Sequence, residues 1–315
     1  MKTLFLSLFV VVCLAADKSA HAVTDGANAA PVPGSQLSNI STRALVQTDD
    51  NVMIGGFIIE GPQAKTVIVR ALGPELIPFM IPDPLMNPTL ELHNSSGALI
   101  ASNNNWVSTI IGGIITSDQV AAIRASGYAP SNSLESAMIV NLPPGNYTAI
   151  VRGVNNMTGV GLVDVYDLTG TTTSLLTNIS TRALVQTGDD VMIGGFIVQG
   201  TQPKRVIIRA IGPELTQFGI PNPLDDPTLE LHDATGALIA SNNDWLNTII
   251  GGIITQNQVR DILDSGLAPG QRSESAIIAQ LPPGNYTAIV RGVSNTTGVG
   301  LIEVYDIDMR ASLGP

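Results

Sequence analysis

Two short clusters of amide and acidic side chains, each closed by a tryptophan, are the residues of this chain best suited to chemistry. They are Asn103-Asn104-Asn105-Trp106 and Asn242-Asn243-Asp244-Trp245. Calcium takes roughly six to eight oxygen ligands, and clustered carbonyl and carboxylate oxygens on a bent loop can supply them. Asn103, Asn105, Asn242 and Asp244 are therefore predicted calcium ligands.

Two other interpretations of these clusters stay open beside calcium. A tryptophan with amide neighbours can form a stacking platform for a sugar. Alternatively, asparagine simply builds a turn, and the tryptophan closes one end of the fold. Acidic neighbours favour calcium in the second cluster only, since Asp225, Asp226 and Asp233 are matched in the first by Met86, Asn87 and Asn94.

Arg70 and Arg209 each interrupt a segment that is otherwise apolar, and a charge placed there needs a partner. We therefore predict structural ion pairs involving Arg70, Glu135, Arg209 and Glu274. Other acids that could take part are Glu75, Glu91, Asp164, Glu214, Glu230 and Glu303. Lys65 and Lys204 begin apolar runs and are predicted to be surface charges that guard a strand.

The motifs of the common hydrolases and nucleotide-binding proteins do not occur. The chain holds no G-x-S-x-G, H-E-x-x-H or P-loop pattern. Alternation in PTLELH places His93 with Thr89 and Glu91 on one face of a strand, so a solvent-side position is predicted for this histidine. We predict no catalytic residue and no enzymatic activity. A hydrolase that uses acids such as Glu135 and Glu274 is a further alternative.

The chain is an internal duplication. Residues 39–168 align with residues 178–307 without a gap at an offset of 139, and 90 of the 130 aligned pairs are identical. Identity at this level requires one fold for both copies. The predicted organisation is a flexible leader at 23–38, a first repeat at 39–168, a short joint at 169–177, a second repeat at 178–308 and a tail at 309–315.

Each repeat is a series of short β-branched runs bounded by turn residues, which is typical of strands. In the first repeat these runs are 41–48, 52–59, 65–71, 88–93, 98–102, 136–141, 146–153 and 159–166. One short helix is predicted after Thr116 and Gln119, which have the spacing of a capping box, with Gly127 as its C-terminal cap. The predicted fold is all-β, with two tandem antiparallel β-sandwich or jelly-roll-like domains.

An uncharged apolar segment follows each tryptophan. It reads STIIGGIIT at 108–116 and NTIIGGIIT at 247–255. Folded inward, the segment would complete the core, and this is the expected arrangement. Exposed, it would be a contact surface for self-association.

The N-terminus predicts export. Residues 1–22 combine Lys2, an apolar run and a small-x-small end at Ala20-His21-Ala22, which is the pattern of a signal peptide cleaved after Ala22. No later apolar stretch is long enough for a transmembrane segment. Cleavage removes two lysines and one aspartate, leaving 13 basic and 25 acidic residues and a formal charge of −12. Such acidity argues against nucleic acid as a partner.

Two long runs carry a resemblance to a known family. DPTLELHDATGALIASNND at 226–244 and LPPGNYTAIVRGVSNTTGVGLIEVYD at 281–306 resemble exported bacterial β-sandwich modules of the pre-peptidase C-terminal type. NISTRALVQTGDDVMIGGFI at 178–197 is similar to an uncharacterised secreted bacterial repeat. The resemblance implies a jelly-roll-like accessory module, with occasional calcium or polysaccharide binding.

Together these observations predict a secreted, non-enzymatic protein that acts by binding or assembly at the cell surface or in the extracellular matrix. Expected partners are a polysaccharide, another surface protein or a second copy of the chain. The alternative is a pair of carbohydrate-binding modules that use Trp106 and Trp245.

Overall fold

Antiparallel strands make up most of the computed structural model, which describes residues 35–169 and 174–308. The first repeat holds β1 (Ser35–Val46), β2 (Met53–Glu60), β3 (Lys65–Leu72), β4 (Pro88–His93), β5 (Leu99–Asn103), β6 (Ser136–Leu142), β7 (Gly145–Gly153) and β8 (Gly159–Asp167). The second holds β9 (Leu175–Val185), β10 (Met192–Gly200), β11 (Lys204–Ile211), β12 (Pro227–His232), β13 (Leu238–Asn242), β14 (Ser275–Leu281), β15 (Gly284–Gly292) and β16 (Gly298–Asp306). The all-β prediction is confirmed.

Helices are short and occupy the connections. Each repeat has one α-helix, α1 (Val120–Ala125) or α2 (Val259–Asp264). The 3-10 helices are η1 (Asp49–Asn51), η2 (Pro74–Phe79), η3 (Val154–Asn156), η4 (Pro213–Phe218) and η5 (Val293–Asn295). Among the described residues, no helix is long and apolar enough to cross a membrane.

Two predicted boundaries shift in the structure. Residues 35–38, assigned to the leader, begin β1, and residues 175–177, assigned to the joint, begin β9. Both extensions pair with the end of a strand from the other repeat, which a single repeat taken alone does not reveal. The predicted signal peptide, leader residues 23–34, joint residues 170–173 and tail residues 309–315 lie outside the described residues.

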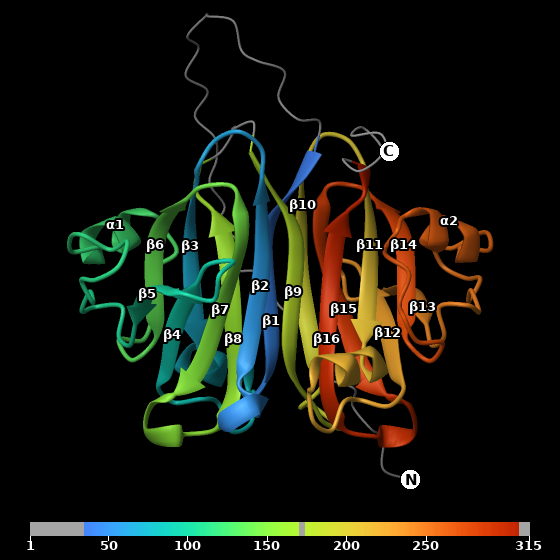
Figure 1. Cartoon of the computed structure of the whole chain (residues 1–315), viewed down its shortest axis with the longest axis horizontal. Coiled ribbons are helices and arrows are strands. Elements are labelled where there is room, and N and C mark those ends of the chain that lie inside the picture. The colour runs from blue at the N-terminus through green and yellow to red at the C-terminus, as the bar shows by residue number, and fades with distance from the viewer. Residues whose placement is uncertain (1–34, 170–173, 309–315) are drawn as a thin grey trace, which may run out of the picture.

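The two repeats share both of their sheets. Strand β1 pairs with β8 of its own repeat and, on its other side, with β10 of the second repeat. In the same way β9 pairs with β16 and with β2 of the first repeat. The result is two eight-stranded antiparallel runs, β6-β3-β8-β1-β10-β15-β12-β13 and β14-β11-β16-β9-β2-β7-β4-β5, which extend through both repeats (Figure 1).

Equivalent residues meet at the centre, where β1 and β9 lie parallel to each other. Leu37 is paired with Leu176, its own counterpart at the offset of 139. The buried hydroxyls of Thr42 and Thr181, another equivalent pair, are 2.8 Å apart. The repeats are therefore related by an approximate two-fold axis that runs along these strands.

The hydrophobic core is likewise continuous across the repeats. One cluster joins buried side chains of both halves, among them Phe57 and Phe196 at the joining strands. Each of these rings stacks on a tyrosine of the neighbouring strand, Tyr147 or Tyr286, with centroids 5.5 Å apart. Each predicted sandwich therefore shares its hydrogen bonding and its core with the other.

Side chains cover the outer edge of β6. The Gln119 carboxamide accepts a hydrogen bond from the Ile139 N–H at 3.0 Å and donates to the carbonyl oxygen of the same residue. The predicted capping box is therefore wrong, because Gln119 binds the strand instead of the start of the helix. Asp118 accepts the hydrogen bond from the Val120 N–H in its place. Gly127 does follow the helix with a positive φ of 77°, as expected for a cap.

Candidate functional site

The first asparagine of each cluster joins the two sheets at an outer end of the molecule. Asn103 Oδ1 accepts a hydrogen bond from the Ala137 N–H at 3.3 Å, and its Nδ2 donates to the Ser108 carbonyl. Asn242 makes the same pair of contacts in the second repeat. Both side chains are buried. Their carbonyl oxygens already accept main-chain hydrogen bonds, so the predicted calcium role does not fit Asn103 or Asn242.

Both tryptophans lie in the interior. Trp106 is 7 % exposed and Trp245 is 8 % exposed. The Trp106 indole N–H donates to the Asn132 carbonyl at 2.9 Å, and the ring packs with Ile68 and Ile123 in a small core beside α1. The exposed sugar-stacking platform that the sequence indicated is therefore not formed by these rings. Of the three interpretations, closure of the end of the fold matches this placement.

Other amide and carboxylate oxygens, in these clusters and at the residue before β4 or β12, have a different character. In the first repeat the Oδ1 atoms of Asn87, Asn104 and Asn105 are buried, and none has a hydrogen-bond partner among the described residues. Asp226 and Asn243, the counterparts of Asn87 and Asn104, repeat this arrangement. Buried acceptors without partners are costly, so their recurrence in both repeats is informative.

In the second repeat two of the corresponding residues are acids, since Asp226 and Asp244 take the places of Asn87 and Asn105. Asp226 precedes β12, and Asp244 follows β13, the partner strand of β12. Burial, and next the charges of Asp244 and Asp225, raise the pKa of Asp226. Within the described residues, no group of three or more His, Cys, Asp or Glu side chains is arranged to hold a metal ion. Any cation at this cluster would thus depend on amide oxygens as well as carboxylates.

The buried arginines find partners on the neighbouring strand. Arg70 Nε and Nη2 donate to the two carboxylate oxygens of Asp164 at 2.9 and 2.6 Å. Arg209 is paired with Glu303 in the second repeat. The predicted ion pairs of the two arginines are present, but naming Glu135 and Glu274 as members of ion pairs is wrong. Asp164 and Glu303 lie directly opposite Arg70 and Arg209 in the strand register.

Glu135 and Glu274 anchor main-chain loops instead. Glu135 is fully buried, and its Oε1 accepts hydrogen bonds from the N–H groups of Gly73 and Glu75 at 3.0 and 2.7 Å. Glu274 binds Gly212 and Glu214 in the same way. Burial raises the pKa of Glu135 to about 7, although the two N–H groups oppose this shift. Enclosed in this way, neither acid can reach a substrate as a hydrolase would require.

The prediction that Lys65 and Lys204 are surface charges is wrong. Lys65 is fully buried and forms an ion pair with Asp167, and Lys204 pairs with Asp306 at 2.7 Å. Each lysine begins a strand whose neighbour ends in an aspartate, so β3 with β8, and β11 with β16, bring the charges together. These side chains hold the fold together and are not free surface charges.

The apolar segments fold into loops over the ends of the sheets. Residues 108–116 follow β5, and the Ile114 N–H donates to the Ile100 carbonyl in that strand at 2.9 Å. Gly113 makes this approach possible, with a φ of 57° and a position where a Cβ atom would lie 2.1 Å from the Ile100 oxygen. Gly252 adopts the same geometry against Ile239. The Gly pair therefore lets the loop shield the edge strand.

These loops turn most of their isoleucines outward, contrary to expectation. Ile115 and Ile254 are buried, whereas Ile111 is 64 % exposed and Ile250 is 58 % exposed. We call the outward-facing side chains the isoleucine caps. Cap 1 consists of Leu99, Val107, Ile110, Ile111 and Ile114, and cap 2 consists of Leu238, Ile249, Ile250 and Ile253.

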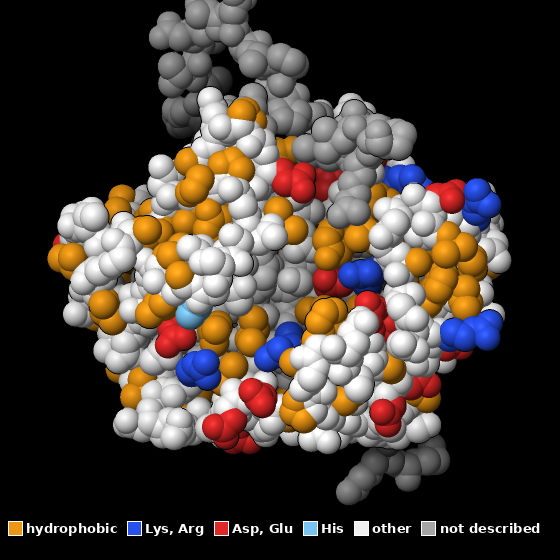
Figure 2. Space-filling view, in the orientation of Figure 1, with side chains coloured by type: hydrophobic (Ala, Val, Ile, Leu, Met, Phe, Trp, Pro, Cys, Tyr) orange, Lys and Arg blue, Asp and Glu red, His pale blue; other side chains and the backbone are white. Residues whose placement is uncertain are grey.

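The isoleucine caps lie at opposite ends of the molecule. They adjoin β5 with α1 and β13 with α2, and these elements occupy the two extremes of the long axis (Figure 1). Figure 2 shows hydrophobic side chains at both of these ends. The segments at 107–117 and 246–257 contain no charged residue, in a chain with a net charge of −11. Two similar apolar surfaces therefore face away from each other.

Comparisons with known proteins identify no family for this chain. No protein-family model matches the chain, and no curated protein matches it. Among solved structures it shows a weak similarity to a DUF4785 family protein from Legionella pneumophila, at 8 % identity and a TM-score of 0.21 over 89 % of each chain. A similarity of this degree carries no inference about fold or function.

Proposed function

We propose that this chain is an exported, non-enzymatic protein that acts by assembly at the cell surface or in the extracellular matrix. The observation that carries the proposal is the pair of isoleucine caps at opposite ends of one continuous double sheet. Exposed apolar surfaces that are grouped together usually serve association. Burying a fully exposed isoleucine contributes roughly 1.5–3 kcal/mol, and because the cap isoleucines are about half exposed, each contributes about half of this and the driving force comes from the whole cap.

The proposed partner is a second copy of the chain. Each cap lacks charge, so two caps can meet without repulsion, whereas the acidic surface elsewhere opposes other contacts between copies. A molecule with one cap at each end is divalent, and head-to-tail contacts that do not close produce a linear assembly. Export rests on the signal peptide predicted at residues 1–22.

Sedimentation velocity of the mature chain over a range of concentrations tests this function. We expect the sedimentation coefficient to rise with concentration, and the double variant Ile111→Lys plus Ile250→Lys to remain monomeric. Both positions are exposed, so folding should survive. The matched control, Gln63→Lys plus Gln202→Lys, adds the same charges in the exposed loops after β2 and β10 and should assemble normally. A wild-type chain that stays monomeric throughout contradicts the proposal.

Calcium binding is a second proposal, favoured by the buried oxygens of Asn87, Asn104 and Asn105 and by their counterparts. The counterpart cluster, with Asp226 and Asp244, is the stronger site because carboxylates bind a hard cation more tightly than amides do. Binding of an ion to the folded state would raise the melting temperature, because it stabilises that state by a free energy that grows with the logarithm of the free ion concentration.

Thermal unfolding with calcium and with a chelator tests the second proposal. We expect calcium to raise the melting temperature by several degrees, and Asp226→Asn plus Asp244→Asn to abolish that rise. The gain-of-function variant Asn87→Asp plus Asn105→Asp, which copies the second cluster into the first repeat, should enlarge the rise. A melting temperature that is unaffected by calcium in every variant removes calcium from consideration.

A further inference from the structure

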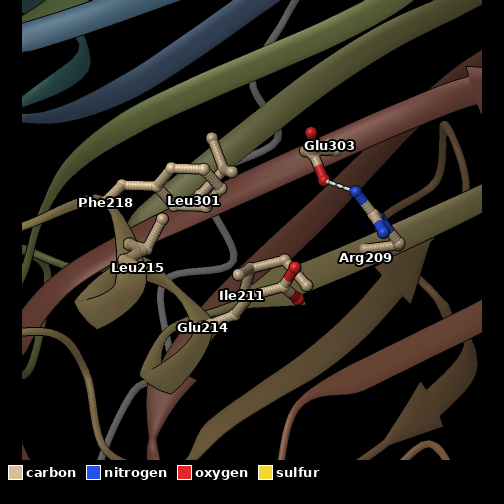
Figure 3. A pocket seen from close by; sticks show the side chains of 7 residues that line it. All are labelled: Arg209, Ile211, Glu214, Leu215, Phe218, Leu301 and Glu303. Atoms are coloured by element: carbon tan, nitrogen blue, oxygen red, sulfur yellow. Dashed lines mark hydrogen bonds and ion pairs between the residues drawn. The ribbon is translucent and has the colours of Figure 1, made fainter. Parts of the chain in front are cut away.

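The second repeat contains a cavity of about 160 Å³ between β11, β16 and η4. Figure 3 shows Arg209 and Glu303 on one side of this cavity and Phe218, Leu215 and Leu301 on the other. The lining is completed by Ile211 and Glu214. An apolar wall therefore faces a charged one across a space of molecular size.

The charged wall differs from its counterpart in the first repeat by one methylene group. Asp164 binds both Nε and Nη2 of Arg70 in a fork. Glu303 binds Arg209 through Nη2 only, because its second oxygen accepts the Tyr305 hydroxyl at 2.8 Å. Arg209 Nε is buried and has no hydrogen-bond partner among the described residues. The second repeat thus leaves unpaired one buried cationic donor that the first repeat pairs with a carboxylate.

The apolar wall differs as well. In the first repeat Phe79 packs against the buried side chains of Leu76 and Val160. Its counterpart Phe218 is 70 % exposed, and the small core of Leu215 and Val299 forms without it. Phe79 is flanked by Pro78 and Met80, which Gln217 and Gly219 replace beside Phe218. The aromatic ring thus stands at the rim of the cavity instead of filling the space beneath it.

We propose that this cavity binds a small, neutral, ring-sized molecule that carries one hydrogen-bond acceptor oxygen. A cavity of about 150 Å³ is known to hold benzene, which sets the size of the ligand body. On binding, the Arg209 side chain would have to turn its buried Nε hydrogen toward the acceptor, while Leu215, Phe218 and Leu301 contact the ring. Two carboxylates and one guanidinium line the site. This excess of negative charge disfavours anionic ligands.

Three probes of nearly equal shape test separately whether the ligand needs an acceptor oxygen and whether it must be neutral. Acetophenone has a ring and a neutral acceptor oxygen, ethylbenzene has the ring without the acceptor, and benzoate adds a negative charge. Ligand-observed NMR titrations of the mature chain should show saturable binding of acetophenone. Loss of a hydrogen bond to a charged donor should weaken ethylbenzene by about tenfold or more. Benzoate should not bind.

Glu303→Asp is the decisive variant, because it restores the acid that pairs with both nitrogens in the first repeat. We expect it to weaken acetophenone binding at least about tenfold, while thermal unfolding shows a fold at least as stable as that of the wild type. Asp164→Glu, the same exchange in reverse in the first repeat, is the matched control and should leave the affinity of the second repeat unchanged. Phe218→Ala, at an exposed position, should weaken binding severalfold without a cost to folding.

The outcomes that overturn the proposal are equally specific. They are an absence of saturable acetophenone binding, equal affinities for acetophenone and ethylbenzene, and an affinity that Glu303→Asp leaves unchanged. None of these results depends on assembly, because the isoleucine caps lie apart from the residues of the cavity.

Discussion

The two repeats have one scaffold but differ in the environment of a buried arginine. Both guanidinium carbons lie close to a tyrosine ring centroid, at 5.3 Å from Tyr166 for Arg70 and at 5.4 Å from Tyr305 for Arg209, but Arg70 is also enclosed by the carboxylate fork of Asp164. Arg209 contacts Glu303 through one nitrogen only and borders a cavity. The isoleucine loops, by contrast, are nearly identical in the two repeats. What the copies share serves the fold and its proposed assembly, and what they have changed opens a site in one of them.

The largest expected effect compares the two ion pairs directly. Asp164→Ala leaves the buried Arg70 without its partner, which typically costs about 3–5 kcal/mol of unfolding free energy. Glu303→Ala should cost less by at least about 1 kcal/mol, because the cavity lets water reach the Arg209 guanidinium. Chemical denaturation of both variants measures the difference. Equal costs would show that the two arginine environments are energetically the same.

A smaller effect tests the feature that the repeats share. Gly113→Ala requires a positive φ and a Cβ atom 2.1 Å from the Ile100 oxygen, so it should destabilise the loop by about 1–3 kcal/mol. Gly112→Ala is the control, because its Cβ would meet nothing within 4 Å and should change stability by less than about 0.5 kcal/mol. Gly252→Ala and Gly251→Ala should reproduce this contrast. A loss confined to one repeat would contradict the equivalence of the loops.

A pH-dependent effect follows from the buried Glu135. The pKa of Glu135 is raised from 4.5 to about 7 by burial, so the folded state binds a proton that the unfolded state has released between these values. Stability should therefore fall as pH rises from about 4.5 to about 7. Glu135→Gln should be less stable at low pH but should show a shallower decline across this window. An unaltered slope in urea denaturation would assign the decline to other groups.

The sequence was sufficient to locate the strands and the helix but not to show how the repeats join. Alternation and turn residues place all eight strands of the first repeat within a few residues, except for the start of β1. Because the joining strands of the two repeats are almost identical, their sequence cannot show whether β1 pairs with its own β2 or with β10. That choice depends on burying two open sheet edges at once, which is a tertiary effect.

The candidate site was predicted only in part, for a similar reason. The tryptophan clusters do lie at the ends of the sheets, but the side chains of Trp106 and Trp245 turn inward. Glu135 resembled an ion-pair acid because its main-chain donors, the N–H groups of Gly73 and Glu75, carry no sequence signature. The cavity beside Arg209 does leave a signal, namely the change from Asp164 to Glu303 between otherwise similar strands. Comparing the repeats position by position would have found it.

Disulfide trapping between the caps tests the central claim of end-to-end assembly most directly. The mature chain should lack cysteine, because Cys13 is the only one and lies in the predicted signal peptide. When Ile111→Cys and Ile250→Cys variants are mixed under mild oxidation, we predict disulfide-linked dimers that form faster than those of a Gln63→Cys control. Equal rates for the caps and the control would contradict assembly through the isoleucine caps.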